Sequence, residues 1–198
     1  MPRSKEQYEE MRKATENKII TAAMHLFVEK GFAAANVQGI ADLAGISIGL
    51  LYKHYRTKEE LFNSLVEYAL AGVQKIIEQF ELEASPKKLI DTFINEIYND
   101  LTTGEELANL MILIKQAIFS GAAVHKKDEV IKRNTNMLKV TAELIKKGQE
   151  CGEFSSGDPY QKSVFFYSAI QGLAEAKVAF KSNFVMPSKS IFTSFLYR

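Results

Sequence analysis

The chain has 198 residues, of which 46% are hydrophobic, and a formal net charge of only +1. This apolar content is ample for a buried core, and no apolar run approaches the ~18–20 residues of a membrane span. The charged N-terminus lacks the apolar segment of a secretory signal. A single cysteine, Cys151, excludes an internal disulfide and fits a reducing cytoplasm; a lone cysteine near a loop is more often inert than a redox sensor.

The basic residues are concentrated toward the N-terminus. Residues 1–58 carry nine Lys and Arg against six Asp and Glu, a surplus of +3, whereas residues 59–198 carry sixteen against eighteen, or −2. A basic end is the footprint expected of a nucleic-acid-binding surface. The surplus is modest, so it supports such a function without establishing it.

The first expected helix contains the apolar residues Ile20, Ala23 and Phe27 and ends near Lys30, because Gly31 follows. Residues 1–16 are polar and either extend this helix or form a loose arm. We expect a solvated, frayed terminus rather than an arm in the DNA minor groove. His25 lies within the apolar run and is expected to be structural.

Two short helices are expected next. The first carries apolar residues at i, i+3, i+4 and i+7, the spacing of one buried face. Gly45 ends it in the left-handed conformation, and Ser47 can cap the second helix, in which Leu51 and Tyr55 point inward. A glycine turn between short helices is typical of the helix-turn-helix, whose second helix enters the DNA major groove; an ordinary antiparallel corner is the alternative. The residues of the buried face are Val37, Ile40, Ala41 and Ala44.

The residues around this turn make the pattern specific, and residues 19–65 resemble the TetR family of bacterial transcriptional regulators. Two departures are visible: Asn36 stands where the family usually has Thr or Ser, and Gly39 where an acidic residue is common. Asn36 can still cap its helix, whereas Gly39 costs it some stability. The resemblance rests on Ala22-Ala23, Leu26-Phe27, Gly31-Phe32, Ile40-Ala41, Ala44-Gly45, Gly49, Leu51-Tyr52, Tyr55, Lys58-Glu59 and Leu61.

This resemblance implies an all-α fold of about nine helices in two domains. Residues 1–58 would form a three-helix DNA-binding domain, and residues 59–198 a helical domain for effector binding and dimerisation. A long helix over 58–80 would join them. Thr57 can cap that helix, with Glu60 completing a capping box. Its apolar positions, which recur every three or four residues, are Leu61, Leu65, Tyr68, Gly72, Ile76 and Phe80.

The rest of the chain is also expected to be helical, because no strand alternation is visible. Pro86 starts a helix with one apolar stripe, and a turn at 102–104 precedes a strongly apolar helix that Ser120-Gly121 ends. Further helices are expected over about 127–150, over about 159–181 and after Pro187. The stripe after Pro86 is Leu89, Phe93, Ile97 and Leu101.

A homodimer is implied by the resemblance, because relatives pair their last two helices in a four-helix bundle. The helix over 159–181 carries a ridge of small residues, and the stripe after Pro187, with Leu196, is too exposed for a monomer. A two-fold protein also matches a palindromic operator. The candidate interface residues are Ser168, Gly172, Ala176, Ala179, Ile191, Phe192 and Phe195.

The DNA contacts can be assigned by reach and by family position. Tyr52, Thr57 and Lys58 match family positions that hold phosphates, and residues at helix starts can donate to phosphates. Gln38 could pair with adenine and Lys53 with guanine, while apolar side chains could meet thymine methyls. The phosphate candidates are Asn36, Ser47, Tyr52, His54, Thr57 and Lys58; the base candidates are Gln38, Ile48, Gly49, Leu50 and Lys53.

An apolar effector pocket is allowed in the C-terminal part, where most phenylalanines fall, although an aromatic-rich core would have the same composition. The candidate lining residues are Phe80, Phe93, Met111, Ile114, Met137, Phe166 and Ile170.

No chemistry-bearing motif is recognisable: there is no Walker loop, dinucleotide fingerprint, His-Glu-x-x-His or calcium loop, and no His and Cys cluster. We therefore expect no catalytic residue, metal or cofactor, and no membrane association. The sequence favours a cytoplasmic, ligand-responsive regulator, most simply a repressor, that binds double-stranded operator DNA. The alternatives are a helical ligand- or protein-binding dimer without DNA binding, and an enzyme with a site in the helical domain.

Overall fold

The computed structural model describes residues 4–119 and 127–197, and these residues form helices and no strand. The expected all-α fold is confirmed, and three long helices begin and end within one residue of their expected bounds. The expected break at Ser120-Gly121 lies outside the described residues. The helices are α1 Lys5–Ala34, α2 Val37–Ala44, α3 Ile48–His54, α4 Lys58–Phe80, α5 Pro86–Thr103, α6 Glu106–Phe119, α7 Lys127–Glu150, α8 Pro159–Phe180, the 3-10 turn η1 Lys181–Asn183 and α9 Lys189–Thr193.

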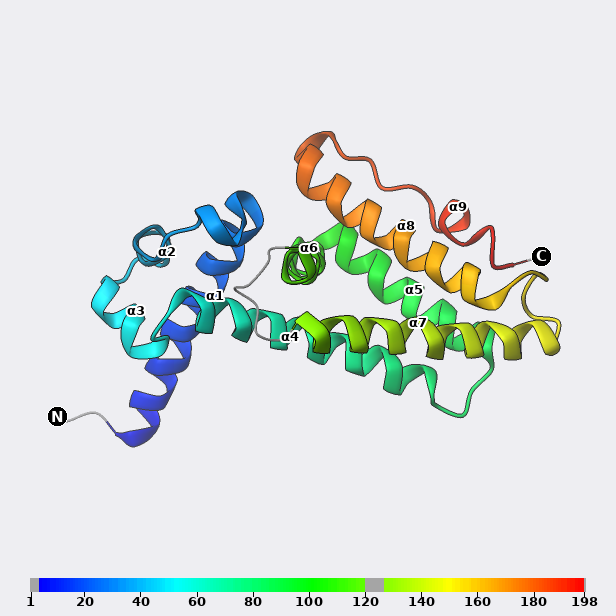
Figure 1. The fold of residues 1–198 in the computed structure, drawn as a ribbon, viewed down its shortest axis with the longest axis horizontal. Coiled ribbons are helices and arrows are strands. Elements are labelled where there is room, and N and C mark those ends of the chain that lie inside the picture. Colours follow the sequence, from blue (N-terminus) through cyan, green and yellow to red (C-terminus); the bar gives the residue numbers. More distant parts are fainter. Residues whose placement is uncertain (1–3, 120–126, 198) are drawn as a thin grey trace.

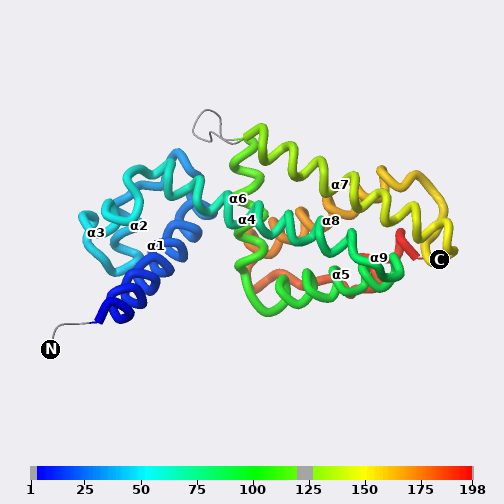
Figure 2. The backbone as a smooth tube through the Cα atoms, turned by 90° about the horizontal axis from the view of Figure 1, so that it is seen from below, coloured from blue at the N-terminus to red at the C-terminus, as the bar shows by residue number. Residues whose placement is uncertain are grey.

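The molecule is elongated, with two groups of helices along its length (Figure 1). The N-terminal bundle, α1 to α3, forms one end, and α5, α7, α8 and α9 form the other. Helix α4 runs from the first group into the second, as Figure 2 also shows. Among the described helices, none is long and apolar enough to cross a membrane.

Helix α1 starts earlier than expected. The Ser4 side chain accepts a hydrogen bond from the Gln7 amide, and the Gln7 side chain accepts one from the Ser4 amide, which is a complete capping box. The expectation of a frayed terminus is therefore wrong. Gly31 does interrupt the helix, with φ of 77°. His25 is exposed, so its expected structural role is wrong.

The predicted helix starts are confirmed by their hydrogen bonds. The side chains of Asn36, Ser47 and Thr57 accept from the amides of Gly39, Leu50 and Glu60, at 2.6, 3.2 and 3.0 Å. Gly45 adopts the left-handed conformation, with φ of 66°. The capping box expected at Thr57 is wrong in one respect, because the Glu60 carboxylate accepts from the Arg56 amide, one residue before the cap.

The first core joins the N-terminal bundle to α4, α6 and α7. The rings of Phe27, Phe32 and Phe62 pack within 6 Å of one another at its centre, and Leu51 and Tyr55 of the helix-turn-helix are buried beside them, as expected. The same core takes in Leu113, Ala117 and Val130. The core therefore continues past residue 58, where the sequence suggests a domain boundary.

The second core fills the space between α4, α5, α7, α8 and the C-terminal segment. Phe192 and Leu196 are buried in it, and the Ser155 amide donates to the Leu196 carbonyl at 2.8 Å. The prediction of an exposed apolar stripe after Pro187 is therefore wrong for these two residues. Helix α9 has only five residues, and Ile191 is its large exposed apolar residue.

A steric test of the second core is available at Gly148, on the buried face of α7. A Cβ atom added there would overlap the fully buried ring of Phe154. We expect Gly148→Ala to lower the free energy of unfolding by about 1–3 kcal/mol, as overpacking does. Urea denaturation would measure it. The control is Gly49→Ala in α3, where the added Cβ meets nothing within 4 Å; a Gly148→Ala protein as stable as wild type would show that the Phe154 ring can move aside.

Candidate nucleic-acid interface and effector cavity

Helix α3 lies at the outer end of the N-terminal bundle (Figure 1). Gly49, Tyr52 and Lys53 are exposed, and 47% of the Tyr52 surface is accessible. Ile48 and Leu50 are half-buried, and Ile48 packs partly against the first core. The base candidates on α3 therefore share one end of the molecule, but the two apolar ones offer less surface than expected.

Gln38 on α2 is exposed, and its amide nitrogen donates to Asp42 one turn later, at 2.7 Å. An amide nitrogen carries two hydrogens, so one can hold Asp42 while the other faces a base. Asp42 thus orients the side chain expected to read adenine. Sequence reasoning missed this partner, although the i, i+4 spacing is the signal that could have found it.

Three of the phosphate candidates act as helix caps. The side-chain oxygens of Asn36, Ser47 and Thr57 are engaged as acceptors by helix amides, yet all three residues are exposed. Their hydroxyl or amide hydrogens can still donate outward while the oxygen accepts. His54, the last residue of α3, is half-buried.

Lys58 is placed differently from what its family position implies. Its ammonium donates to the carbonyls of Phe32, Ala33 and Ala35 at 2.8, 3.3 and 2.8 Å and lies 4.5 Å from the centre of the Phe32 ring. These bonds engage all three of its hydrogens. Lys58 therefore ties the start of α4 to the end of α1, and a phosphate contact would require the ammonium to leave these carbonyls.

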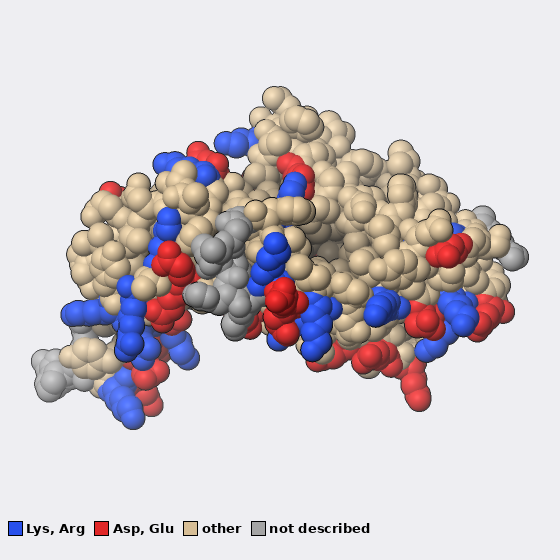
Figure 3. Space-filling model, in the orientation of Figure 1, with Lys and Arg blue, Asp and Glu red and all other residues tan. Residues whose placement is uncertain are grey.

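Two further exposed side chains at this end were missed from the sequence. Arg56 lies two residues after the end of α3, and Leu43 on α2 is exposed over 54% of its surface. Leu43 falls outside the apolar stripe of α2, which was the available signal. Figure 3 shows Lys and Arg side chains, interspersed with Asp and Glu, at the lower part of this end and also along the lower edge of the rest of the molecule.

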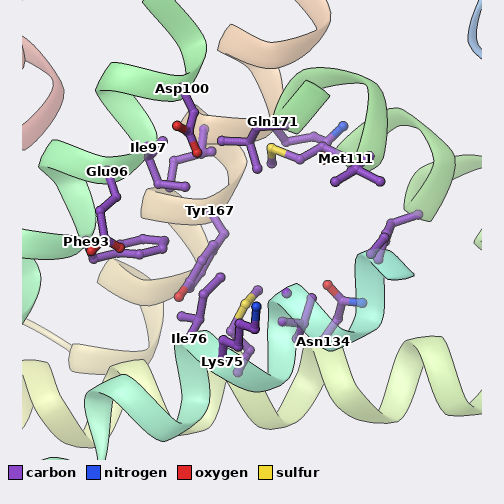
Figure 4. A pocket seen from close by; sticks show the side chains of 18 of the residues that line it. Lys75, Ile76, Phe93, Glu96, Ile97, Asp100, Met111, Asn134, Tyr167 and Gln171 are labelled. Carbon is purple, nitrogen blue, oxygen red and sulfur yellow. The ribbon is translucent and has the colours of Figure 1, made fainter. Parts of the chain in front are cut away.

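A cavity of about 330 Å³ lies between α4, α5, α6, α7 and α8. Of the predicted lining residues, Phe80 and Phe166 do not line it, because both are buried in the second core. Figure 4 shows Ile76, Phe93, Ile97, Met111 and Tyr167 around one central space. The predicted residues that do line it are Phe93, Met111, Ile114, Met137 and Ile170.

The polar groups of the cavity wall were not predicted. The Tyr167 hydroxyl lies 2.9 Å from Thr141 Oγ1, which itself donates to the Met137 carbonyl, so Tyr167 is the donor in this pair. Burial raises the pKa of the Tyr167 hydroxyl, which stays neutral. The sequence does not distinguish a polar helical residue that faces water from one that faces a cavity, because the spacing is the same in both cases. The other polar lining residues are Lys75, Gln79, Glu96, Asp100, Asn134 and Gln171.

Helix α6 belongs to both the cavity and the first core. Leu107, Leu110, Met111 and Ile114 line the cavity, while Leu113 and Ala117 are buried in the first core. The Gln116 amide nitrogen donates to the Phe27 carbonyl of α1 at 2.8 Å. Among the described residues no group of three or more His, Cys, Asp or Glu could hold a metal ion.

Residues 19–65 match the family described as bacterial regulatory proteins, tetR family. The uncharacterized HTH-type transcriptional regulator YerO of Bacillus subtilis (strain 168) is 33% identical over 98 residues, which cover 48% of this chain and 34% of that protein. The HTH-type transcriptional repressor NicS of Pseudomonas putida (strain KT2440) is 23% identical over 71% of this chain and 66% of its own length.

The fold is similar to the solved structure of the MbdR regulator from Azoarcus sp. CIB, with a TM-score of 0.75 and 22% identity over 92% of this chain and 97% of that one. The family match covers the helix-turn-helix whose caps, glycine turn and buried face are described above. By sequence, residues 19–65 of this chain belong to the TetR family of bacterial helix-turn-helix transcriptional regulators, and the chain as a whole shares the fold of a solved regulator.

Proposed function

We propose that this protein is a ligand-responsive repressor that binds a palindromic operator as a homodimer and releases it when an apolar or amphipathic small molecule enters the cavity. The observation that carries this proposal is the double position of α6, which lines the cavity and also packs into the core beneath the helix-turn-helix. On this proposal the protein is not an enzyme, needs no cofactor and acts in the cytoplasm, where its DNA lies. The relative NicS is a transcriptional repressor, which supports repression rather than activation here.

Base recognition on this proposal depends on few side chains. Gln38 and Lys53 are exposed polar residues of α2 and α3 that can form hydrogen bonds to base edges. Ile48 and Leu50 offer only part of their surface to thymine methyls. Tyr52, with the caps Asn36, Ser47 and Thr57, would hold phosphates and set the position of α3 in the groove.

The homodimer would form through the exposed face of α8. Ser168, Gly172 and Ala179 are exposed, and Ala176 is half-buried. Phe192 is taken up by the core of its own chain, so we leave it out of the proposed interface; Ile191 and half-buried Phe195 remain. A two-fold dimer would present two copies of α3 to half-sites about 34–36 Å apart or a multiple of that spacing.

The switch would use two helices. Helix α4 spans ~33 Å from Lys58 to Phe80, so a small tilt displaces its far end by ångströms. Helix α6 offers a shorter path, because Gln116 holds the backbone of α1 directly. A ligand shifts such an equilibrium only by its preference for one state, and reducing an even mixture to ~1% competent protein needs roughly 100-fold preference.

The first test concerns specificity. Gln38→Ala and Lys53→Ala should each relax the operator preference at one or two positions per half-site, because each contact is worth ~1–3 kcal/mol of discrimination. Selection of binding sites from random DNA would measure this. Lys146→Ala, an exposed lysine of α7, is the control. Unchanged preferences in both variants would place specificity in DNA shape instead.

The second test separates the two roles of Lys58. Because its ammonium satisfies three carbonyls, we expect Lys58→Ala to lower the free energy of unfolding by on the order of 1–2 kcal/mol, with an unchanged salt dependence of DNA binding. Lys53→Ala, at an exposed site, should leave stability intact. A loss of about one unit in the log–log salt slope of Lys58→Ala would show instead that Lys58 holds a phosphate. Tyr52→Phe should weaken binding to all sequences alike.

The third test concerns coupling through α6. Gln116→Leu removes the hydrogen bond to Phe27 but leaves the cavity wall unchanged, because Gln116 does not line the cavity. With N-phenyl-1-naphthylamine as an apolar probe, we expect similar probe affinity but a several-fold smaller loss of operator affinity on adding the probe. Fluorescence titration and mobility shift measure the two. Gln74→Leu on α4 is the control, and equal coupling in both variants would exclude this path.

A further inference from the structure

The cavity does not end beneath α8 but continues to the surface. A groove between α6, α7 and α8 shares part of its lining with the cavity. The groove then extends outward past Phe119, Val164 and Gly172, which the cavity does not reach. A molecule in the cavity therefore has one side that opens along α8. The shared lining residues are Ile114, Asn134, Met137, Tyr167 and Gln171.

The edge of this opening is held by a polar network between α6 and α8. Glu175 accepts hydrogen bonds from Lys115 and from Gln171, both at 2.9 Å. These two hydrogen bonds lower the pKa of the Glu175 carboxyl, which stays ionised and pairs with the Lys115 ammonium. Gln171 thus lines both the cavity and the groove while it is fixed by charged neighbours, so the edge is ordered and its charges cancel.

Apart from the Lys115–Glu175 pair, whose charges cancel, the α8 surface beside the opening is apolar and carries no charge. Residues 163–174 of α8 include no Asp, Glu, Lys or Arg. Phe165 is exposed over 58% of its surface and Phe119 of α6 over 77%. Such a neutral apolar patch does not suit DNA, which requires cations, but marks a protein contact.

The small residues of α8 point to a second copy of this chain as the partner. Ser168, Gly172 and Ala179 are exposed along one face, and space is open around Gly172, where an added Cβ would meet nothing within 4 Å. Another helix can therefore approach the backbone closely. A neutral face of one helix is self-complementary across a two-fold axis, because the same patch serves both subunits.

We propose that a second copy seated on this face closes the groove and completes the open side of the cavity, so that effector binding and subunit association strengthen each other. This inference rests on the proposed function in taking the cavity as the effector site. A bound molecule would expose part of its apolar surface to the groove. The second copy of the chain would remove that surface from water. Thermodynamic linkage makes the coupling reciprocal. If dimerisation lowers the dissociation constant of the ligand by some factor, each bound ligand lowers the dissociation constant of the dimer by the same factor.

The direct test needs no mutation. The dimer dissociation constant of the full chain is measured by sedimentation with and without saturating N-phenyl-1-naphthylamine, and the affinity for this probe is measured above and below that constant. We expect the probe to lower the dimer dissociation constant at least 10-fold and to bind correspondingly more tightly to the dimer. A dimer constant that the probe does not change would overturn the inference, as would the absence of saturable probe binding.

Two variants locate the effect on α8. Gly172→Arg places a charge on the face where the chain itself leaves open space, and arginine is a better helix former than glycine. Ala179→Arg lies on the same face but lines neither the cavity nor the groove, so it cannot block the opening. Thr92→Arg, at an exposed site of α5, is the control. We expect both α8 variants to be monomeric and to bind the probe at least ~3-fold more weakly, because the two probe molecules of a dimer share the 10-fold change in the dimer constant.

The outcomes separate the inference from the proposed function. Monomeric variants with wild-type probe affinity would overturn the coupling, and variants that remain dimeric with wild-type affinity would overturn the α8 contact. Thermal melts of each variant show whether it is folded, and the mutation-free measurement stands if one is not. If the wild type fails to bind its own upstream DNA while the probe still tightens the dimer, the repressor proposal fails and the coupling holds.

Discussion

The arrangement of this protein depends on the burial of α6 from two sides. This 14-residue helix gives Leu113 and Ala117 to the core around Phe27 and Phe62, and Met111 and Ile114 to the wall of the cavity. Close-packed interiors transmit displacements rather than absorb them. A change in the volume of the cavity contents therefore has a mechanical route to the core that supports the helix-turn-helix.

Local hydrogen bonds fix the ends of the helices in the helix-turn-helix. Each of its helices begins at a side-chain cap, and Gly45 makes the turn in a conformation that costs other residues energy. Lys58 adds a long-range bond by satisfying the last carbonyls of α1. These bonds fix the ends of the helices around α3, and the proposed base contacts depend on the position that they give it.

Local signals predicted the helices, the caps and the turn, because these depend on residues within a few positions of one another. The errors come from contacts between distant segments. Phe192 reads as an exposed dimer residue until the chain folds back over Phe166, and Lys58 reads as a phosphate ligand until the end of α1 is placed beside it. Phe80 and Phe166 were expected in the cavity wall because an apolar side chain suits a cavity and a core equally well.

The first core also has a consequence for how the protein is made. The match to the DNA-binding family ends at residue 65, yet the core of that region includes Val130. A ribosome that adds ~5–20 residues per second needs ~3–13 s to extend the nascent chain across this interval. During that time the helix-turn-helix has emerged with part of its apolar surface still exposed to water. The core of the N-terminal bundle is therefore completed late in translation, after α6 and the beginning of α7 have been synthesised.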